Sequence, residues 1–433
     1  GVAGYVVLAG VLLFLYVKLK PGLETLPWSA RMLWLLYLTA ATFVLLRLSS
    51  VVKVMNYLSL HSFYLWRLRD SYIQKEVDAR GKVCAGRSAD VPLADLQKDN
   101  RAQPWGPYHV IGTALNTSGS ADIRNLGRKS DAFFLSPFYS GSSTTGFAPT
   151  KEHYPTLKVG EAMAISGAAF SPNQGRATNT SLAILMTLFN ARLGFWLKNP
   201  RLLSGSKENL SRFPPYLLYW IEMFGKASGS DPYVYLSDGG HFDNSGIYEL
   251  IRRRCRYIIA VDGSGEPSDK EARFGTIGIV SRLVRIDFGV DIQMDLNLME
   301  PDKEKGHTKS HYALGRIVYP KERDDQKEED REGLLVYLKA SLLGDENAPD
   351  LEYYDRISPM FPNHSTADQF FDEAQFESYR ALGYHIARDA FRETLVGKIT
   401  EEQEKGPQKE HWLRLDRLCG RWNQDVIGPP VNG

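Results

Sequence analysis

The sequence lacks an excess of charge of either sign and has few cysteines. It holds 52 lysines and arginines against 51 aspartates and glutamates, which gives no reason to expect nucleic acid as a partner. Its three cysteines, Cys84, Cys255 and Cys419, are odd in number, far apart and without the spacing of a zinc or redox motif. We therefore expect a reducing compartment for the globular part. No cluster of His, Asp and Glu has the spacing of metal ligands, so we expect no metal, and no cofactor is expected either.

Long apolar runs are also scarce, although two stand near the start. Residues 2–17 and 32–46 contain no charged side chain, and a spanning helix needs about 20 apolar residues. The first run is cut by the start of the chain at Gly1, and the second extends to Val52 if Arg47 reaches the membrane surface. These runs predict a transmembrane helical hairpin over residues 1–53. Two buried core helices or a cleaved signal are the alternatives.

The central stretch, residues 233–267, alternates between strand and helix patterns. Residues 233–236 read as a buried strand, apolar residues recur at helical spacing over 247–251, and residues 257–261 form a second apolar, β-branched run. This order predicts a parallel α/β unit. In such units, catalytic groups collect at the carboxyl ends of strands, which is where Asp238 stands.

Asp238 is followed by Gly239 and Gly240, which allow a sharp turn behind it. The aspartate has a structural interpretation as well, because it can cap the next helix or make a local turn. His241 is expected to line the site or to cap, rather than to act as a base. Asn244 is expected to cap the helix that follows, near the same site.

Elements on either side are predicted from the same patterns. Residues 108–116 and 132–135 read as strands, and residues 160–169 as a helix rich in small side chains. Residues 367–392 read as a long amphipathic helix, and residues 401–433 as a polar tail.

Several of these blocks resemble the patatin-like phospholipase family. The family has a strand ending in Asp-Gly-Gly or Asp-Gly-Ala, as at Asp238, and a small-residue helix like GEAMAISGAAFSPNQG at residues 160–175. Residues 56–69 and 361–383 are similar to blocks of a membrane-attached bacterial branch. The resemblance implies a parallel-sheet core flanked by helices. It also implies a Ser–Asp dyad without histidine, in which Asp238 takes the proton of the serine.

The nucleophile of that dyad is missing from the printed sequence. The family places its serine in a Gly-x-Ser-x-Gly turn, and no serine here has glycine at both second positions. Ser166 lies in a helical stretch without those glycines, which would hide its hydroxyl, and it is the alternative nucleophile within this sequence. We expect the serine and its oxyanion hole to precede Gly1, with this segment supplying the aspartate.

These observations predict a membrane-anchored lipid acyl hydrolase with lipid as substrate. The expected domains are the hairpin (1–53), the carboxyl part of an α/β hydrolase domain (54–400) and the tail (401–433). The expected location is the bacterial inner membrane, with the globular part in the cytoplasm. The alternative is an inactive scaffold or lipid-binding module on the same fold. The sequence gives no oligomeric state.

Overall fold

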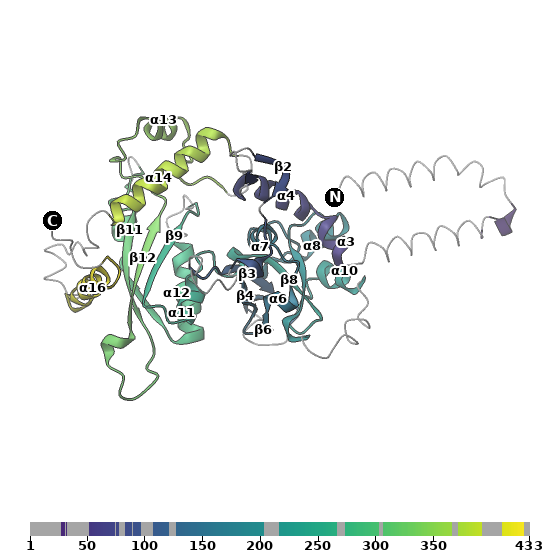
Figure 1. Cartoon of the computed structure of the whole chain (residues 1–433), viewed down its shortest axis with the longest axis horizontal. Coiled ribbons are helices and arrows are strands. Elements are labelled where there is room, and N and C mark those ends of the chain that lie inside the picture. Colours follow the sequence, from purple (N-terminus) through teal and green to yellow (C-terminus); the bar gives the residue numbers. More distant parts are fainter. Residues whose placement is uncertain are drawn as a thin grey trace. The chain divides into compact units, whose positions relative to one another are not determined.

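The computed structural model describes the chain in segments that form two compact units, Gly1–Asn244 and Ser245–Gly433 (Figure 1). The described residues are 27–30, 32, 52–73, 75–77, 83–88, 90–96, 107–120, 127–202, 216–265, 273–302, 306–365, 371–391 and 409–427.

The first unit is built on a six-stranded antiparallel sheet with the order β6-β5-β4-β3-β8-β7. Its strands are β3 (Ile111–Asn116), β4 (Ser130–Leu135), β5 (Tyr139–Ser142), β6 (Gly146–Pro149), β7 (Phe195–Lys198) and β8 (Tyr233–Asp238). A separate two-stranded sheet joins β1 (Lys75–Val77) to β2 (Val83–Ser88). The helices are α3 (Val52–Tyr57), α4 (Leu60–Tyr72), α6 (Thr150–His153), α7 (Val159–Ser166), α8 (Thr180–Leu188) and α10 (Tyr216–Met223).

Alternation along β8 divides the core of this unit into two layers. Val234 and Leu236 belong to the cluster on the face that α7 covers, whereas Tyr235 packs with Met55, Trp196 and Leu218 on the other face. Both faces of the strand are therefore buried, which explains why its sequence is apolar at nearly every position.

A buried ion pair fixes the elements on the second face. Arg192 and Glu222 have fully buried side chains that pair with each other. The Arg192 guanidinium also donates to the carbonyl oxygen of Met55 at 2.7 Å, and Trp196 Nε1 donates to Glu222 at 2.7 Å. Because each charge has several partners, the desolvation cost is offset, and α3, β7 and α10 are held together.

The free edge of β7 is occupied by a side chain of α3. The Asn56 amide donates to the carbonyl oxygen of Trp196 at 2.9 Å and accepts from the Trp196 N–H at 3.0 Å. These are the two bonds that a further strand would make. Asn56 therefore satisfies the backbone at the middle of the edge strand.

The second unit contains a four-stranded mixed sheet with the order β10-β11-β12-β9. Its strands are β9 (Tyr257–Asp262), β10 (Asp291–Met294), β11 (Tyr312–Val318) and β12 (Glu332–Lys339). Its helices are α11 (Ile247–Arg252), α12 (Gly275–Phe288), α13 (Pro349–Ile357), α14 (Glu373–Phe391) and α16 (Lys409–Trp422). Only β12 and β9 are parallel; the other two pairings are antiparallel.

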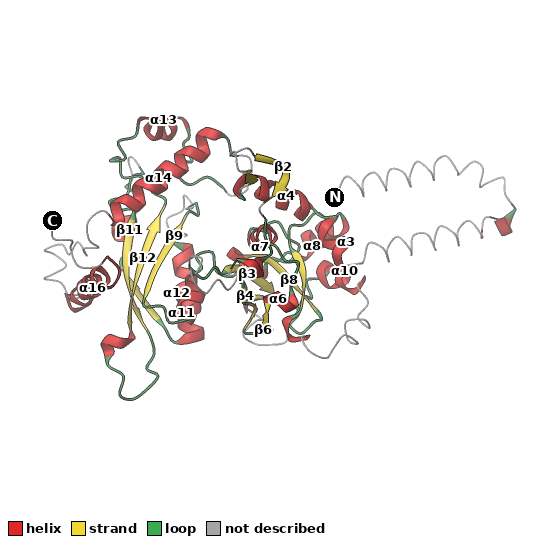
Figure 2. Cartoon of the chain, in the orientation of Figure 1, coloured by secondary structure: helices red, strands yellow, loops and turns green. Residues whose placement is uncertain are grey.

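Helices α13, α14 and α16 bury one face of this sheet. Leu334, Val336 and Leu338 of β12 share a buried cluster with Leu382 of α14 and Trp422 of α16. Figure 2 shows α11 and α12 along the other side of the sheet within this unit. Helix α16 thus forms core within residues 401–433, for which a polar tail is expected from the sequence.

The predicted parallel α/β unit over residues 233–267 is wrong. β8 pairs antiparallel with β3 and β7, whereas β9 lies in the other sheet and runs parallel to β12. The strands and the helix between them are where the sequence places them, but β8 and β9 are not partners. The predicted fold class, a parallel-sheet core of patatin-like type, is therefore also wrong.

The expected hairpin lies almost wholly outside the described residues, which include only 27–30, 32, 52 and 53 of the range 1–53. The predicted inner-membrane location is corrected by one finding. No helix in the described part of the chain is long and apolar enough to cross a bilayer.

Candidate functional site

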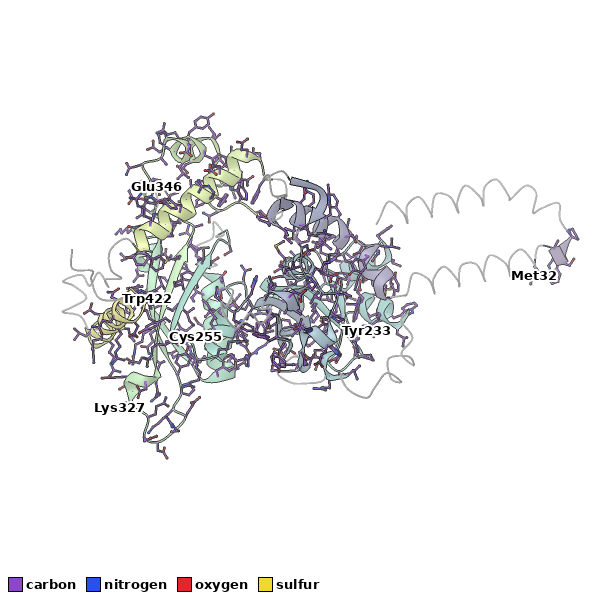
Figure 3. The ribbon with its side chains drawn as sticks, in the orientation of Figure 1. Met32, Tyr233, Cys255, Lys327, Glu346 and Trp422 are labelled. Carbon is purple, nitrogen blue, oxygen red and sulfur yellow. The ribbon has the colours of Figure 1, made fainter. Side chains whose placement is uncertain are left out.

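Asp238 ends β8 and lies opposite Thr113 of β3. Tyr233, at the other end of the strand, is labelled in Figure 3. Because side chains alternate between the faces of a sheet, the carboxyl group is on the face that α7 covers. The backbone N–H of Asp238 donates to the carbonyl oxygen of Ala168, just beyond α7, at 3.3 Å. Asp238 is consequently only partly exposed at the end of α7.

Close contacts require a glycine at 239 and favour one at 240. A Cβ atom on Gly239 would lie 2.8 Å from the carbonyl oxygen of Gly112, which is backbone and has little freedom to move. A Cβ atom on Gly240 would lie 2.8 Å from Asn244 Oδ1. With no side chain in the way, the Gly240 N–H donates to Asp238 Oδ1 at 2.7 Å and fixes the carboxyl group.

Burial changes the acidity of this carboxyl group. Desolvation raises the pKa of Asp238 above its ordinary value, and the Gly240 N–H opposes the rise only in part. Among the described residues, Gly240 is the only hydrogen-bond donor to the carboxylate, through Oδ1. Its second oxygen, Oδ2, has no hydrogen-bond donor among the described residues, and an ionised carboxylate oxygen can accept one.

Tyr64 of α4 is the neighbour that sequence reasoning misses. Its pKa is raised by burial and then by the negative charge of Asp238. A Cβ atom on Gly167 would overlap the Tyr64 hydroxyl, so the absence of a side chain at Gly167 lets α4 lie against α7. The two residues are far apart in the sequence, and an aromatic residue in an amphipathic helix gives no signal of its own.

Ser166 ends α7 near the same part of β3. Its hydroxyl donates to the carbonyl oxygen of Gly112 at 2.7 Å, and the described residues show no hydrogen bond between Ser166 and Asp238. The structure therefore brings the serine and the aspartate to one region without forming a dyad from them.

His241 is directed to the opposite face of β8. Its Nδ1 lies 2.8 Å from the hydroxyl of Ser237, which accepts a hydrogen bond from the Asn116 amide at 2.8 Å. Burial lowers the pKa of His241 to about 4, so the ring is neutral near pH 7. The imidazole thus belongs to a buried Asn116–Ser237–His241 chain, on the side of the strand away from the Asp238 carboxyl group.

A second aspartate, Asp262, ends β9 in the other unit and has a different environment. Ser264 donates to Asp262 Oδ1 through its hydroxyl at 2.6 Å and its N–H at 2.9 Å. The Tyr337 hydroxyl donates to Oδ2, and Lys339 Nζ lies 3.4 Å from the same oxygen. Burial alone would raise the pKa of Asp262, but Lys339 and the three donors hold it below its ordinary value. This carboxylate is a satisfied ion rather than a proton acceptor.

Comparisons with known proteins give one distant likeness. No family model matches the sequence, and no curated protein matches it. The solved structure of human GIVD cytosolic phospholipase A2 is similar with a TM-score of 0.41 and 12% identity, over 76% of this chain and 47% of that chain. The chain thus spans about half the length of the structure it matches. A likeness this distant leaves the function to be argued from the site itself.

The resemblance to the patatin-like family is corrected by these findings. It implied a parallel core, and the sheet that carries Asp238 is antiparallel throughout. The short blocks that suggested the family correspond to a strand ending in Asp-Gly-Gly and to a helix of small residues. Neither block specifies the direction of the neighbouring strands.

Proposed function

We propose that this chain supplies the general base of an acyl hydrolase that cleaves ester bonds of lipids. The observation that carries the proposal is the Asp238 carboxylate, which is desolvated and oriented by one backbone N–H, with no donor to its second oxygen among the described residues. A raised pKa strengthens a carboxylate as a base.

The proposed reaction has two steps with Asp238 in both. A serine hydroxyl attacks the ester carbonyl carbon as its proton passes to Asp238, and the alcohol leaves with that proton when the ester C–O bond breaks. Water then attacks the acyl-serine and gives a proton to Asp238. The fatty acid departs, and the proton returns to the serine oxygen. In this proposal the chain supplies the aspartate of the Ser–Asp dyad.

Exposed apolar side chains in the same unit support a lipid substrate. Helices α8 and α10 pack together, and both present large apolar groups to solvent. On α8 and just after it these are Leu182, Leu185, Leu188 and Phe189; on α10 and just after it they are Trp220 and Phe224, whose rings stack. Apolar side chains exposed on two adjoining helices are typical of surfaces that bind a membrane, another protein or an apolar ligand.

The decisive experiment compares two aspartates of the same unit. Asp231 precedes β8, at the end of the strand opposite Asp238. Its pKa is also raised by burial, and it too accepts a backbone N–H, from Ser228 at 3.1 Å. In the natural full-length protein, Asp238→Asn should slow hydrolysis of a lipid ester about 10²–10⁴-fold, whereas Asp231→Asn should retain it. Unchanged turnover in folded Asp238→Asn would reject the assignment.

The serine is to be found by chemical labelling. A fluorophosphonate probe reacts with activated serines, so peptide mass spectrometry of the labelled protein identifies the nucleophile. Labelling should be lost in Asp238→Asn and kept in Asp231→Asn. A protein that neither hydrolyses lipid esters nor reacts with the probe would contradict the proposal.

The lipid part has its own test. The double variant Leu185→Ser, Trp220→Ser should hydrolyse a short, soluble ester normally and a vesicle-bound ester more slowly. Tyr353→Ser, another exposed aromatic residue in the second unit, serves as the control and should behave as wild type on both. Equal loss on both substrates would show that the apolar face does not select lipid.

A further inference from the structure

A group of metal-ligating side chains lies in the second unit, apart from Asp238. His311 immediately precedes β11, Asp345 lies in the loop after β12, and His385 is in α14. His385 Nε2 is 3.2 Å and His311 Nε2 is 3.9 Å from Asp345 Oδ1, and the ligand atoms of the three residues lie within 4.8 Å of one another. Figure 3 labels Glu346, the next residue in the loop.

The orientation of His311 leaves a buried ring nitrogen directed at this group. The side chain is fully buried, and its Nδ1 lies 3.2 Å from the hydroxyl of Ser341. When that hydroxyl donates to the carbonyl oxygen of Lys339, at 3.3 Å, it can accept from Nδ1–H, and Nε2 is then the unprotonated nitrogen. Nε2 has no hydrogen-bond partner among the described residues.

A buried ring nitrogen that faces a carboxylate oxygen is stabilised by a positive charge between them, which a metal ion can supply. An unsatisfied buried polar atom is costly, and two electron-rich atoms directed at each other add repulsion. The second imidazole, from His385, lies against the first with ring centroids 5.4 Å apart. Its Nε2 atom also lies near Asp345 Oδ1. We propose that His311, Asp345 and His385 bind one Zn²⁺ ion.

The donor set and the spacing fit this ion. Zn²⁺ takes imidazole nitrogen and carboxylate oxygen at about 2.0–2.1 Å, which places tetrahedral ligand atoms about 3.3 Å apart. Of the three pairs of ligand atoms, His385–Asp345 matches this spacing and His311–Asp345 must close by about 0.6 Å. The two imidazole nitrogens lie within 4.8 Å of each other and must also close to reach it. Calcium and magnesium prefer oxygen ligands throughout, so two histidines select against them.

The burial of the three ligands also suits a metal site. His311 is enclosed, the His385 side chain is 26% exposed and the Asp345 side chain is 57% exposed. One side of the group is therefore open to solvent, where water can complete the coordination. The hydroxyl of Ser341 supplies the outer hydrogen bond that fixes a ligating imidazole. The ion would join α14 to the ends of two strands.

The test measures zinc binding by the full chain after removal of metal with a chelator. Wild type should take up one Zn²⁺, measured by competition with a chromophoric chelator and by metal analysis. His385→Ala and Asp345→Asn should each weaken binding at least about 100-fold, more than the usual loss of an outer hydrogen bond. His109→Ala and Asp324→Asn, at exposed positions elsewhere, are the matched controls and should bind as wild type.

Thermal unfolding gives a second readout. Zn²⁺ that binds the native state alone raises Tm, so wild type should gain stability with zinc and Asp345→Asn should not. Asp345 is exposed enough that its amide variant is expected to fold. No zinc uptake by wild type would overturn the proposal. Equal affinity in wild type and both ligand variants would overturn it as well, because the ion would then bind elsewhere.

Discussion

Asp238 and Asp262 are both strand-ending aspartates, yet their surroundings give them opposite acidity. Burial raises the pKa of Asp238, which receives one backbone N–H. Burial acts on Asp262 in the same direction, but Lys339, Ser264 and Tyr337 outweigh it and lower the pKa. The difference shows that the position at a strand end does not decide the role of a carboxylate. The number and charge of its partners do.

The largest expected difference between the Asp238→Asn and Asp262→Asn variants is in catalytic turnover. Removal of a general base typically costs about 10²–10⁴-fold in rate, so Asp238→Asn should lose that much turnover. Asp262→Asn should keep normal turnover for each folded molecule, because its carboxylate is saturated. Initial rates on a soluble ester, divided by the folded fraction, measure both. Equal losses in the two variants would abolish the distinction.

The second largest expected difference between the two variants is in the free energy of unfolding. Asp262→Asn leaves the Lys339 ammonium, whose side chain is 3% exposed, without its counter-charge. Loss of one member of a buried pair costs about 3–5 kcal/mol, which denaturant unfolding detects. The double variant Asp262→Asn, Lys339→Met should recover much of the loss. If the double variant is as unstable as the sum of the two single variants, the ion pair is not the cause.

A pH series sharpens the comparison further. Only ionised Asp238 accepts a proton, so turnover should fall about tenfold for each pH unit below its raised pKa, with a midpoint above the ordinary 3.8. The pKa of Asp262 is shifted in the opposite direction, and its ionisation affects stability rather than turnover. Its stabilisation is present above the unfolded-state pKa and is lost as pH falls through the lower folded-state pKa. An acid limb centred at or below 3.8 would contradict the raised pKa.

The smallest expected effect is on stability, where Asp238→Asn should act in the opposite direction to Asp262→Asn. Ionised Asp238 is disfavoured in the folded state, so its contribution lowers stability as pH rises through its folded-state pKa. Asp238→Asn should therefore be slightly more stable than wild type at neutral pH, with the gain vanishing at acid pH. Parallel thermal unfolding at the two pH values checks this. Destabilisation at neutral pH would mean that the charge helps the fold.

Local patterns predict the elements of this protein better than their partners. The apolar run over residues 233–236 and the two glycines after Asp238 are enough to place a strand end and a turn, and β8 and η4 (Gly239–His241) are found there. The direction of the sheet depends on β3 and β7, which are remote in sequence. No local pattern distinguishes a parallel partner from an antiparallel one for a strand buried on both faces.

The same limit applies to the candidate sites. Asp238, Gly239 and Gly240 are visible in the sequence because they are consecutive. Tyr64 is not, because α4 reaches the site only by packing on α7. The sequence predicts no metal because no short spacing joins histidines and acids. The proposed zinc ligands come from three separate elements, so only the fold brings them together.

The amide of Asn56 has a consequence for how copies of this protein behave in a crowded solution. β7 is the last strand of its sheet, and a bare rim of this kind invites a strand from another molecule. Asn56 holds both hydrogen-bonding groups of Trp196. The Asn56 side chain thus disfavours pairing of β7 with a strand of another copy. A leucine of similar size at this position could not form these two hydrogen bonds.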